Sequence, residues 1–391
     1  MEHSTTQNIP NNQIWYTSSD GNVVTPNKTY YVFGATIKSN TYSNGKGVIT
    51  FDGDVTMIGD EAFYNCDKLT SVTLPESVAS IGKKAFYDCD GLTEFTIPDS
   101  VTTIGYEAFY KCTSLTSVKI GDSVTTIGYF AFSSCTSLTS VNIPDSVTTI
   151  GDAAFAGCDS LTSVNIPDSV TEIGNYAFGS CRNIQEFTGK FAEDNGRILV
   201  VDSVLTAFAP AGITEYNIPD SVTTIGEWAF AYCTSLTNVK IPDSVTKIGW
   251  CAFDACTSLT SVNIPDSVTT IGDEAFSNCN SLTSVNIPDS VTTIGEYAFY
   301  DCDSLTSVNI PDSVTTIGER AFTACDSLTS VYCKATTPPS LGNTYVFRNN
   351  GSGCDIYVPA GSVNTYKSAY GWSEYAYAIV GYDFENGVVV E

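Results

Sequence analysis

The chain has 391 residues and a formal net charge of −26, with 43 Asp and Glu against 17 Lys and Arg. Such a charge repels phosphate backbones and anionic headgroups, which are bound by clustered Lys and Arg, so we expect no nucleic-acid partner. Residues 1–12 hold no apolar run of signal-peptide length, and no later segment approaches a membrane span, so direct membrane insertion is excluded as well.

Residues 1–45 show no periodicity and are predicted to form an N-terminal cap. The only histidine, His3, lies in this segment. Catalysis that needs a histidine at a defined place, as in serine hydrolases and Cys-His proteases, is therefore excluded for the folded body.

Residues 46–334 repeat with a period of 23. The unit Leu259–Asn280 predicts a strand from Ser261 to Ile264, a Pro-Asp-Ser turn, a second strand from Ser267 to Ile271, and one helical or 3₁₀ turn that points Phe276 and Cys279 inward. One coil cannot bury its own apolar face, so stacked coils must supply the core. The fold class is a β-rich α/β-type repeat solenoid, a superhelix of 23-residue coils with two parallel sheets and short helical or 3₁₀ turns.

The period breaks once, at residues 189–212, where one repeat is longer than the others. The β-forming run from Arg197 to Phe208 has Asp202-Ser203 at its middle, which predicts a β-hairpin that replaces the short helix and projects from the coil. Residues 335–391 are predicted to form a C-terminal cap, with Ser362 capping a short helix through Lys367 and a strand near 375–380.

The repeat Leu-Thr-Ser-Val-Asn-Ile-Pro-Asp-Ser-Val-Thr-Thr-Ile-Gly, followed by Ala-Phe and Cys, resembles the BspA-type (Treponema-type) leucine-rich repeat, as found in gut Bacteroidetes. The resemblance covers about three quarters of the chain by its run of repeats. It implies a leucine-rich-repeat fold and a secreted or surface-anchored protein, some members of the family being adhesins. It implies no catalytic residue, because the family shares none.

The periodic cysteines predict a reduced core ladder rather than a metal site, because zinc motifs gather ligands through short paired spacings. Outside the ladder, Cys251 is predicted to be exposed, and Cys333 and Cys354 are left open as a pair or as free thiols. The repeated aspartates follow proline at a turn and share one environment, which favours turn capping over acid and base chemistry. We therefore expect no enzyme, no metal and no cofactor.

Two groups of variable positions are candidate partner-binding surfaces. The first strand of each coil offers a face of amides and hydroxyls, which includes Asn142, Asn165, Asn263 and Asn286. The positions around the Ala-Phe pair are often aromatic. We predict that the hairpin creates a ledge lined by Tyr176, Trp228, Tyr232 and Trp250, since exposed Tyr and Trp are enriched at recognition surfaces.

The expected function is a non-enzymatic binding or adhesion module that recognises a host or bacterial surface protein, or a glycan, through the solenoid surface. The alternative is a structural spacer or assembly component, including a phage or virion part, with no ligand of its own. We expect a cell-surface or secreted location, with the signal peptide missing from the present sequence. The oligomeric state does not follow from the repeat.

Overall fold

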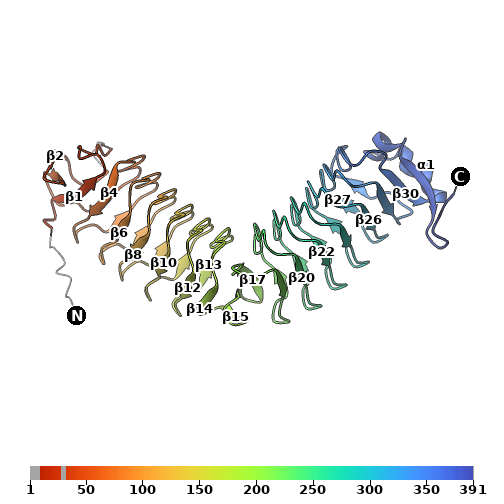
Figure 1. Ribbon diagram of the computed structural model, residues 1–391, viewed down its shortest axis with the longest axis horizontal. Coiled ribbons are helices and arrows are strands. Elements are labelled where there is room, and N and C mark those ends of the chain that lie inside the picture. The colour runs from red at the N-terminus through yellow and green to blue at the C-terminus, as the bar shows by residue number, and fades with distance from the viewer. Residues whose placement is uncertain (1–8, 28–31, 391) are drawn as a thin grey trace. The chain divides into compact units, whose positions relative to one another are not determined.

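The computed structural model describes residues 9–27 and 32–390, so that His3 lies outside the described residues. The chain forms two compact units, Met1–Leu199 and Val200–Glu391 (Figure 1). Each unit is a stack of coils, and each is described by itself below.

The N-terminal unit begins with an antiparallel sheet in the order β2-β3-β1-β4. Its strands are β1 (Gln13–Ser18), β2 (Ile37–Ser43), β3 (Lys46–Phe51) and β4 (Leu69–Thr73). β1 pairs with both β3 and β4, so this sheet covers the first coil. The boundary predicted at residue 45 falls within the β2–β3 hairpin, because β3 pairs back with β1 instead of starting the parallel stack.

The regular coils of the N-terminal unit supply two parallel sheets. The longer strands are β6 (Glu94–Thr96), β8 (Ser117–Lys119), β10 (Ser140–Asn142), β12 (Ser163–Ile166) and β14 (Glu186–Gly189). The two-residue strands are β5 (Ser80–Ile81), β7 (Thr103–Ile104), β9 (Thr126–Ile127), β11 (Thr149–Ile150) and β13 (Glu172–Ile173). Equivalent residues of successive coils pair directly, as Val118 does with Val141, so the repeat sets the register.

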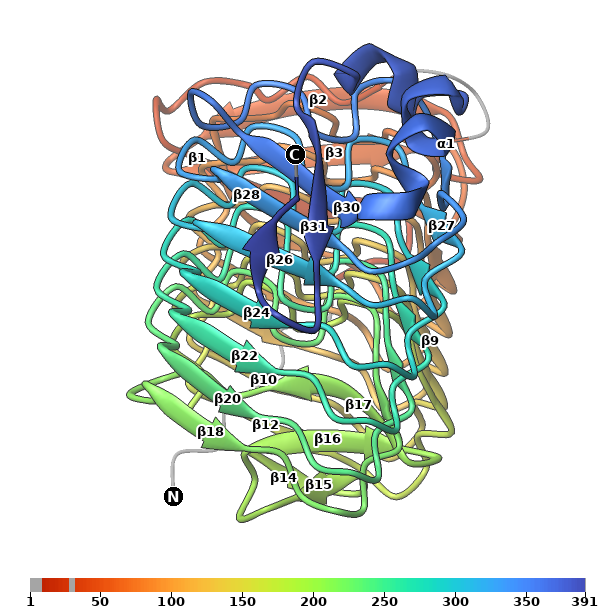
Figure 2. The same ribbon diagram turned by 90° about the vertical axis from the view of Figure 1, so that its right-hand side faces the viewer.

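The C-terminal unit has two sheets of its own, built in the same way, and Figure 2 shows their strands one behind another. The first holds β18 (Glu215–Asn217), β20 (Asn238–Lys240), β22 (Ser261–Asn263), β24 (Ser284–Asn286), β26 (Ser307–Ile310), β28 (Ser330–Cys333), β30 (Asp355–Pro359), β31 (Ile379–Asp383) and β32 (Val388–Val389). The second holds β17 (Val204–Phe208), β19 (Thr224–Ile225), β21 (Lys247–Ile248), β23 (Thr270–Ile271), β25 (Thr293–Ile294), β27 (Thr316–Ile317) and β29 (Ser340–Leu341).

The interruption of the repeat does form a hairpin, but the hairpin belongs to the second sheet. β15 (Ala192–Glu193) pairs antiparallel with β16 (Ile198–Val201). β16 neighbours β17 across Asp202-Ser203, whose φ values of 49° and 64° suit a type I′ turn. β17 pairs parallel with β19, and Leu205 is buried. The prediction that the hairpin projects is therefore wrong, because its apolar side chains complete the core.

The C-terminal segment continues the solenoid before it closes it. β30 and β31 extend the first sheet in parallel, and β32 ends it antiparallel. The 3₁₀ turns η1 (Ala360–Ser362) and η2 (Trp372–Tyr375) flank helix α1 (Val363–Ser368). Ser362 precedes α1 as predicted, but its hydroxyl donates to the carbonyl oxygen of Thr336 and does not cap the helix. Trp372 and Tyr366 are buried and close the end of the core.

The third side of each coil consists of two consecutive hydrogen-bonded turns where a short helix was predicted. In one coil the amides of Ala275 and Ser277 donate three residues back. The amides that alternate with these, those of Glu274, Phe276 and Asn278, donate to carbonyl oxygens of the next coil. Glu274 and Asn278 have φ values of 54° and 58°, and these left-handed residues stop helix propagation. We call this side, from the Ile-Gly glycine to the periodic cysteine, the turn face.

The core consists of columns of identical side chains. The periodic phenylalanine rings stack on each other, for example Phe253 on Phe276 at 5.1 Å between ring centroids and 2° between planes. The Ile-Gly glycines are not among the residues with positive φ. A Cβ on Gly272 would lie 2.7 Å from the carbonyl carbon of Gly249, so glycine is needed there because successive backbones pass close together.

Candidate functional site

The turn face carries two columns of left-handed residues, one two positions before the periodic phenylalanine and one two positions after it. The first column has φ values between 51° and 61° and comprises Glu61, Lys84, Glu107, Phe130, Ala153, Tyr176, Trp228, Cys251, Glu274, Tyr297 and Arg320. The second comprises Asn65, Asp88, Lys111, Ser134, Gly157, Ser180, Tyr232, Ala255, Asn278, Asp301 and Ala324.

The residues of the first column are not the types that left-handed backbone favours. A residue with a β-carbon costs roughly 1–2 kcal/mol in the left-handed region, which Gly and Asn tolerate best. The second column contains Gly and Asn, as this preference predicts, but the first contains neither. The large aromatic and charged side chains of the first column are thus present in spite of their backbone cost.

Three of the four predicted ledge residues lie in these columns. In the C-terminal unit, the indole rings of Trp228 and Trp250 are in edge-to-face contact at 5.3 Å between ring centroids. Trp250 is 45% exposed, and its indole nitrogen donates to Glu274 at 3.4 Å. Tyr232 is half-buried on the same side. Tyr176 belongs to the N-terminal unit, where its hydroxyl hydrogen-bonds Ser180, so the joining of all four in one ledge stays a prediction.

The turn face of the N-terminal unit carries a second group of aromatic residues. Tyr64, Tyr87 and Tyr110 stack in successive coils with ring centroids 4.9 and 5.1 Å apart. Beside them, Tyr106, Tyr129 and Phe130 are exposed. Lysines accompany the rings, and Lys84 forms an ion pair with Glu107 at 3.2 Å. The hydrogen bond from Lys84 to Glu107 raises the pKa of this lysine.

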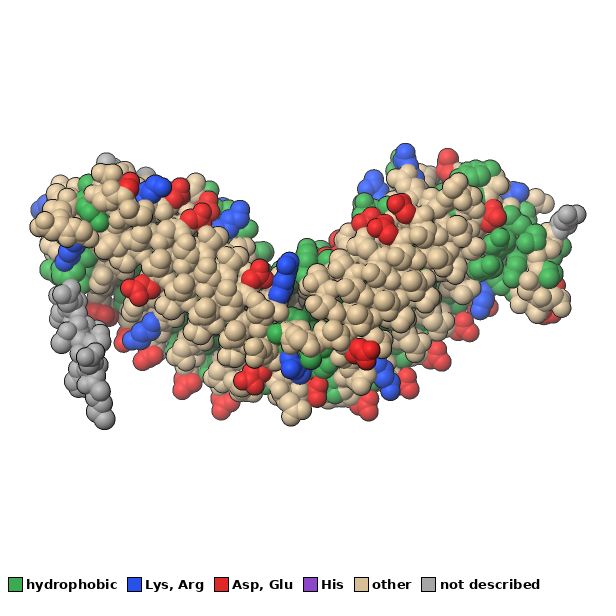
Figure 3. All heavy atoms as spheres, in the orientation of Figure 1, with side chains coloured by type: hydrophobic (Ala, Val, Ile, Leu, Met, Phe, Trp, Pro, Cys, Tyr) green, Lys and Arg blue, Asp and Glu red, His purple; other side chains and the backbone are tan. Residues whose placement is uncertain are grey.

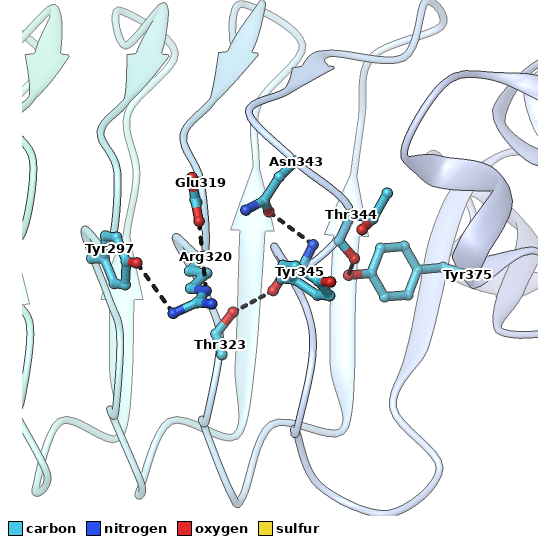
Figure 4. A network of polar contacts seen from close by, with 8 residues as sticks. All are labelled: Tyr297, Glu319, Arg320, Thr323, Asn343, Thr344, Tyr345 and Tyr375. Carbon is cyan, nitrogen blue, oxygen red and sulfur yellow. Dashed lines mark hydrogen bonds and ion pairs between the residues drawn. The ribbon is translucent and has the colours of Figure 1, made fainter.

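The turn face of the C-terminal unit carries a polar network at its end (Figure 4). The guanidinium of Arg320 lies between the rings of Tyr297 and Tyr345, at 5.7 and 5.6 Å from their centroids. It donates to the Tyr297 hydroxyl at 3.2 Å and pairs with Glu319 at 3.6 Å. Thr323 donates to the carbonyl oxygen of Tyr345 and so holds the backbone of Tyr345 against the preceding coil.

The amide face of the first sheet is exposed, as predicted. Asn142 and Asn165 in the N-terminal unit, and Asn263 and Asn286 in the C-terminal unit, all point away from the core. The viewed surface of each unit in Figure 3 is mostly uncharged polar side chain and backbone, with charges towards its edges.

The predicted asparagines of the N-terminal unit line a shallow hollow. Asn142 and Asn165 share it with Asp122 and Asp145. Gly121 stands in the neighbouring coil where most coils have proline, and a Cβ there would lie 2.3 Å from the carbonyl oxygen of Pro98. The Gly121 backbone thus sits closer to the preceding coil than a proline would allow.

The cysteines form free thiols throughout. The periodic cysteines are buried except Cys66, which is partly buried. Even this partial burial raises the pKa of the Cys66 thiol to about 11. The prediction of an exposed Cys251 is wrong: its small side chain is buried, close to the carboxyl groups of Glu274 and Asp254. Cys333 and Cys354 are not bonded to each other, and Cys333 hydrogen-bonds the Tyr366 hydroxyl at 3.2 Å. Within the described residues, no three Cys, Asp or Glu gather as metal ligands.

Comparison with known proteins identifies the class of protein. The family profile described as "BspA type Leucine rich repeat region (6 copies)" matches residues 56–185 and 205–329. The chain therefore belongs to the BspA-type leucine-rich-repeat family, as its repeat indicated. None of the curated proteins matches the chain.

Several solved structures are similar. A leucine rich cell surface protein from Faecalibacterium prausnitzii is 34% identical, with a TM-score of 0.61 over 76% of this chain and 86% of that one. A leucine-rich repeat protein from Eubacterium ventriosum is 22% identical, with a TM-score of 0.56 over 72% and 90%. The pneumococcal vaccine antigen PcpA is 18% identical, with a TM-score of 0.55 over 91% and 88%, and these last two share the fold alone. Among the described residues, no helix is long and apolar enough to span a bilayer.

Proposed function

We propose that the protein is a non-enzymatic binding or adhesion module, placed on the cell surface or secreted, that recognises a protein or glycan through its turn face. The observation that carries this proposal is the first left-handed column, where Phe130, Tyr176, Trp228, Tyr297 and Arg320 occupy positions that the backbone favours for Gly or Asn. Tyr, Trp and Arg are the side chains most enriched at binding hot spots. The cell surface description of the F. prausnitzii relative supports the location.

The alternative function, a structural spacer or assembly component, rests on the uniformity of the coils. Ser-Val-Asn-Ile-Pro-Asp-Ser recurs unchanged in several of them. A spacer needs only the buried columns and has no use for strained aromatic residues on its surface. A signal peptide or lipid-anchor signal encoded upstream in the open reading frame would contradict a phage or virion component.

The test is a binding screen on arrays of glycans and of host and bacterial surface proteins. Any partner is then measured against the double variant Trp228→Ala/Trp250→Ala and the triple variant Tyr106→Ala/Tyr129→Ala/Phe130→Ala. These side chains lie outside the core columns, so both variants should remain folded, and at least one should lose binding. A matched control, Asn263→Ala/Asn286→Ala on the strand face, should bind normally. A screen with no partner above background would overturn the proposal.

A further inference from the structure

A second hollow lies at the C-terminal end of the C-terminal unit, next to the polar network of Tyr345 and Tyr375. It is bounded by the loop 347–354, which leads into β30, and by the segment 375–378, which leads into β31. Its wall is held in place by Tyr375, whose hydroxyl donates to the carbonyl oxygen of Thr344 at 2.7 Å (Figure 4). The same hydroxyl accepts the backbone amide of Phe347 at 3.1 Å.

The lining of this hollow is cationic in a chain whose net charge is −26. Arg348 is its only ionised side chain, and the lining contains neither Asp nor Glu. The guanidinium lies 4.9 Å from the ring centroid of Tyr345, and Arg348 takes part in none of the ion pairs found among the described residues. Burial raises the pKa of the Cys354 thiol to about 11, so this neighbour stays neutral near pH 7. Arg348 thus has no carboxylate partner in the lining itself, while the charges of Asp355 and Glu374 act on Cys354 and Tyr375 from beside it.

A buried donor without an acceptor lies in the same lining. The side-chain oxygen of Asn350 accepts the backbone amide of Cys325 at 3.1 Å, which fixes the orientation of the group. The nitrogen Nδ2 of Asn350 is buried and has no hydrogen-bond partner. Two other buried side-chain atoms lack a hydrogen bond in the described residues, Glu107 Oε2 and Asp159 Oδ1, but both lie against a cation. Of the three atoms, only Asn350 Nδ2 has neither a hydrogen-bond partner nor an ion nearby, and a buried donor in this state is destabilising.

An aromatic ring stands beside these two donors. Tyr377 is 88% exposed, the highest value among the exposed large hydrophobic residues, although it contributes to the lining. An unburied tyrosine next to a polar hollow offers a flat apolar face to a ligand whose polar groups enter the hollow.

We propose that this hollow binds an acidic sugar, a pyranose ring that carries a carboxylate or a sulfate. The anionic group meets the guanidinium of Arg348, a ring or anionic oxygen accepts from Asn350 Nδ2, and the apolar face of the ring packs on Tyr377. Charge-assisted hydrogen bonds from guanidinium are the strong ones for such oxyanions. The inference rests on the proposed function as a binding module and names one site and one ligand class for it.

The experiment measures binding of D-galacturonate and of galactose 6-sulfate to the whole protein by calorimetry, with neutral galactose, acetate and a tetraglutamate peptide as comparison ligands. We expect at least one acidic sugar to bind, with an affinity at least tenfold higher than that of galactose or acetate. Which of the two acidic sugars binds more tightly shows whether the site prefers a carboxylate or a sulfate. Failure of both acidic sugars, or equal binding of galactose, acetate or the peptide, would overturn the proposal.

Three variants locate the site. Asn350→Asp keeps the acceptor for the Cys325 amide but removes the donor, and Arg348→Gln removes the charge at an exposed position where folding is not at risk. Each of these two variants should bind the acidic sugar at least tenfold more weakly than the parent does. Tyr377→Ala should lower the affinity by a smaller factor. The charge-matched control Arg182→Gln, in the N-terminal unit, should bind as the parent does. Unchanged affinity in Arg348→Gln would overturn the proposal even if Asn350→Asp failed to fold.

Failure here can be told apart from failure of the proposed function. The array screen reports on the turn-face aromatic residues, which Arg348→Gln and Asn350→Asp leave in place. If array partners bind while acidic sugars do not, the site is refuted and the binding module stands.

Discussion

The thiol of Cys279 donates a hydrogen bond to the carbonyl oxygen of Phe253, one coil earlier, at 3.3 Å. The same bond recurs along the column, for example from Cys89 to Phe63 at 3.0 Å and from Cys302 to Phe276 at 3.2 Å. Nine of the periodic cysteines make this bond, and the accepting oxygen can serve a turn amide as well, as that of Phe253 accepts the amide of Cys256 at 3.2 Å. Burial raises the pKa of the Cys279 thiol, so the column is both hydrogen-bonded and unreactive.

The first prediction concerns thiol reactivity. The native protein should react slowly with iodoacetamide at about pH 8, since a thiol of pKa about 11 such as that of Cys354 is ionised to roughly one part in a thousand there. In denaturant, all 14 cysteines should be titrated by Ellman's reagent without prior reduction. A native melting temperature that falls on addition of reductant would contradict the free-thiol structure.

The second prediction tests the phenylalanine column. Phe276 is fully buried and stacks on Phe253 and Phe299. Phe276→Ala should lower the free energy of unfolding by roughly 3–5 kcal/mol, because it removes a large buried ring and leaves a cavity. The exposed Asn286→Ala in the following coil is the control and should change it by no more than about 0.5 kcal/mol. Equal melting of Phe276→Ala and the parent would show that the ring does not support the core.

The third prediction tests the left-handed column with two adjacent alanines. Ala153 has a φ of 52°, whereas Ala154 is not among the positive-φ residues, and both are buried. Replacement by glycine is the same chemical change at both sites, but only Ala153→Gly relieves a left-handed β-carbon. We expect Ala153→Gly to be more stable than Ala154→Gly by about 1–2 kcal/mol in chemical denaturation. The reverse order would refute the left-handed assignment.

The fourth prediction concerns pH and Asp254. Burial raises the pKa of this carboxyl above its ordinary value of 3.8, against the hydrogen bond that Asn278 donates to it at 2.9 Å. Below 3.8 the group is neutral in the folded and unfolded states. As pH rises through the folded pKa, ionisation costs free energy in the folded state, so stability falls.

Asp254→Asn should therefore melt at a higher temperature than the parent near pH 7, and the two curves should converge near pH 3. The amide retains an oxygen that can accept from Asn278. Asp266→Asn, at an exposed turn, is the matched control and should not reproduce this pH-dependent difference. A constant difference at all pH values would attribute the effect to packing instead of charge.

The period of 23 was enough to predict the solenoid, the two parallel sheets and the buried Phe, Cys, Val and Ile columns, because side chains that repeat once per coil must stack on themselves. It was not enough to predict the turn face. Gly-x-x-Ala-Phe-x-x-Cys has the spacing of a helical turn, yet the amides of Glu274, Phe276 and Asn278 bond to the next coil, and only the presence of that coil makes left-handed backbone the better solution.

The same limit applies to the candidate sites. The sequence alone determined which positions vary, and so identified Trp228, Trp250 and the exposed asparagines. The hairpin at 189–212 was recognised by its turn residues, but its insertion in the sheet of β17 and β19 depends on the open edge that the next coil offers. The hollow beside Arg348 has no sequence signal, because Asn350 and Tyr377 are brought together only when β31 pairs with β30. Local periodicity determines what each coil buries, whereas contacts between segments distant in sequence decide which polar groups are left without a partner.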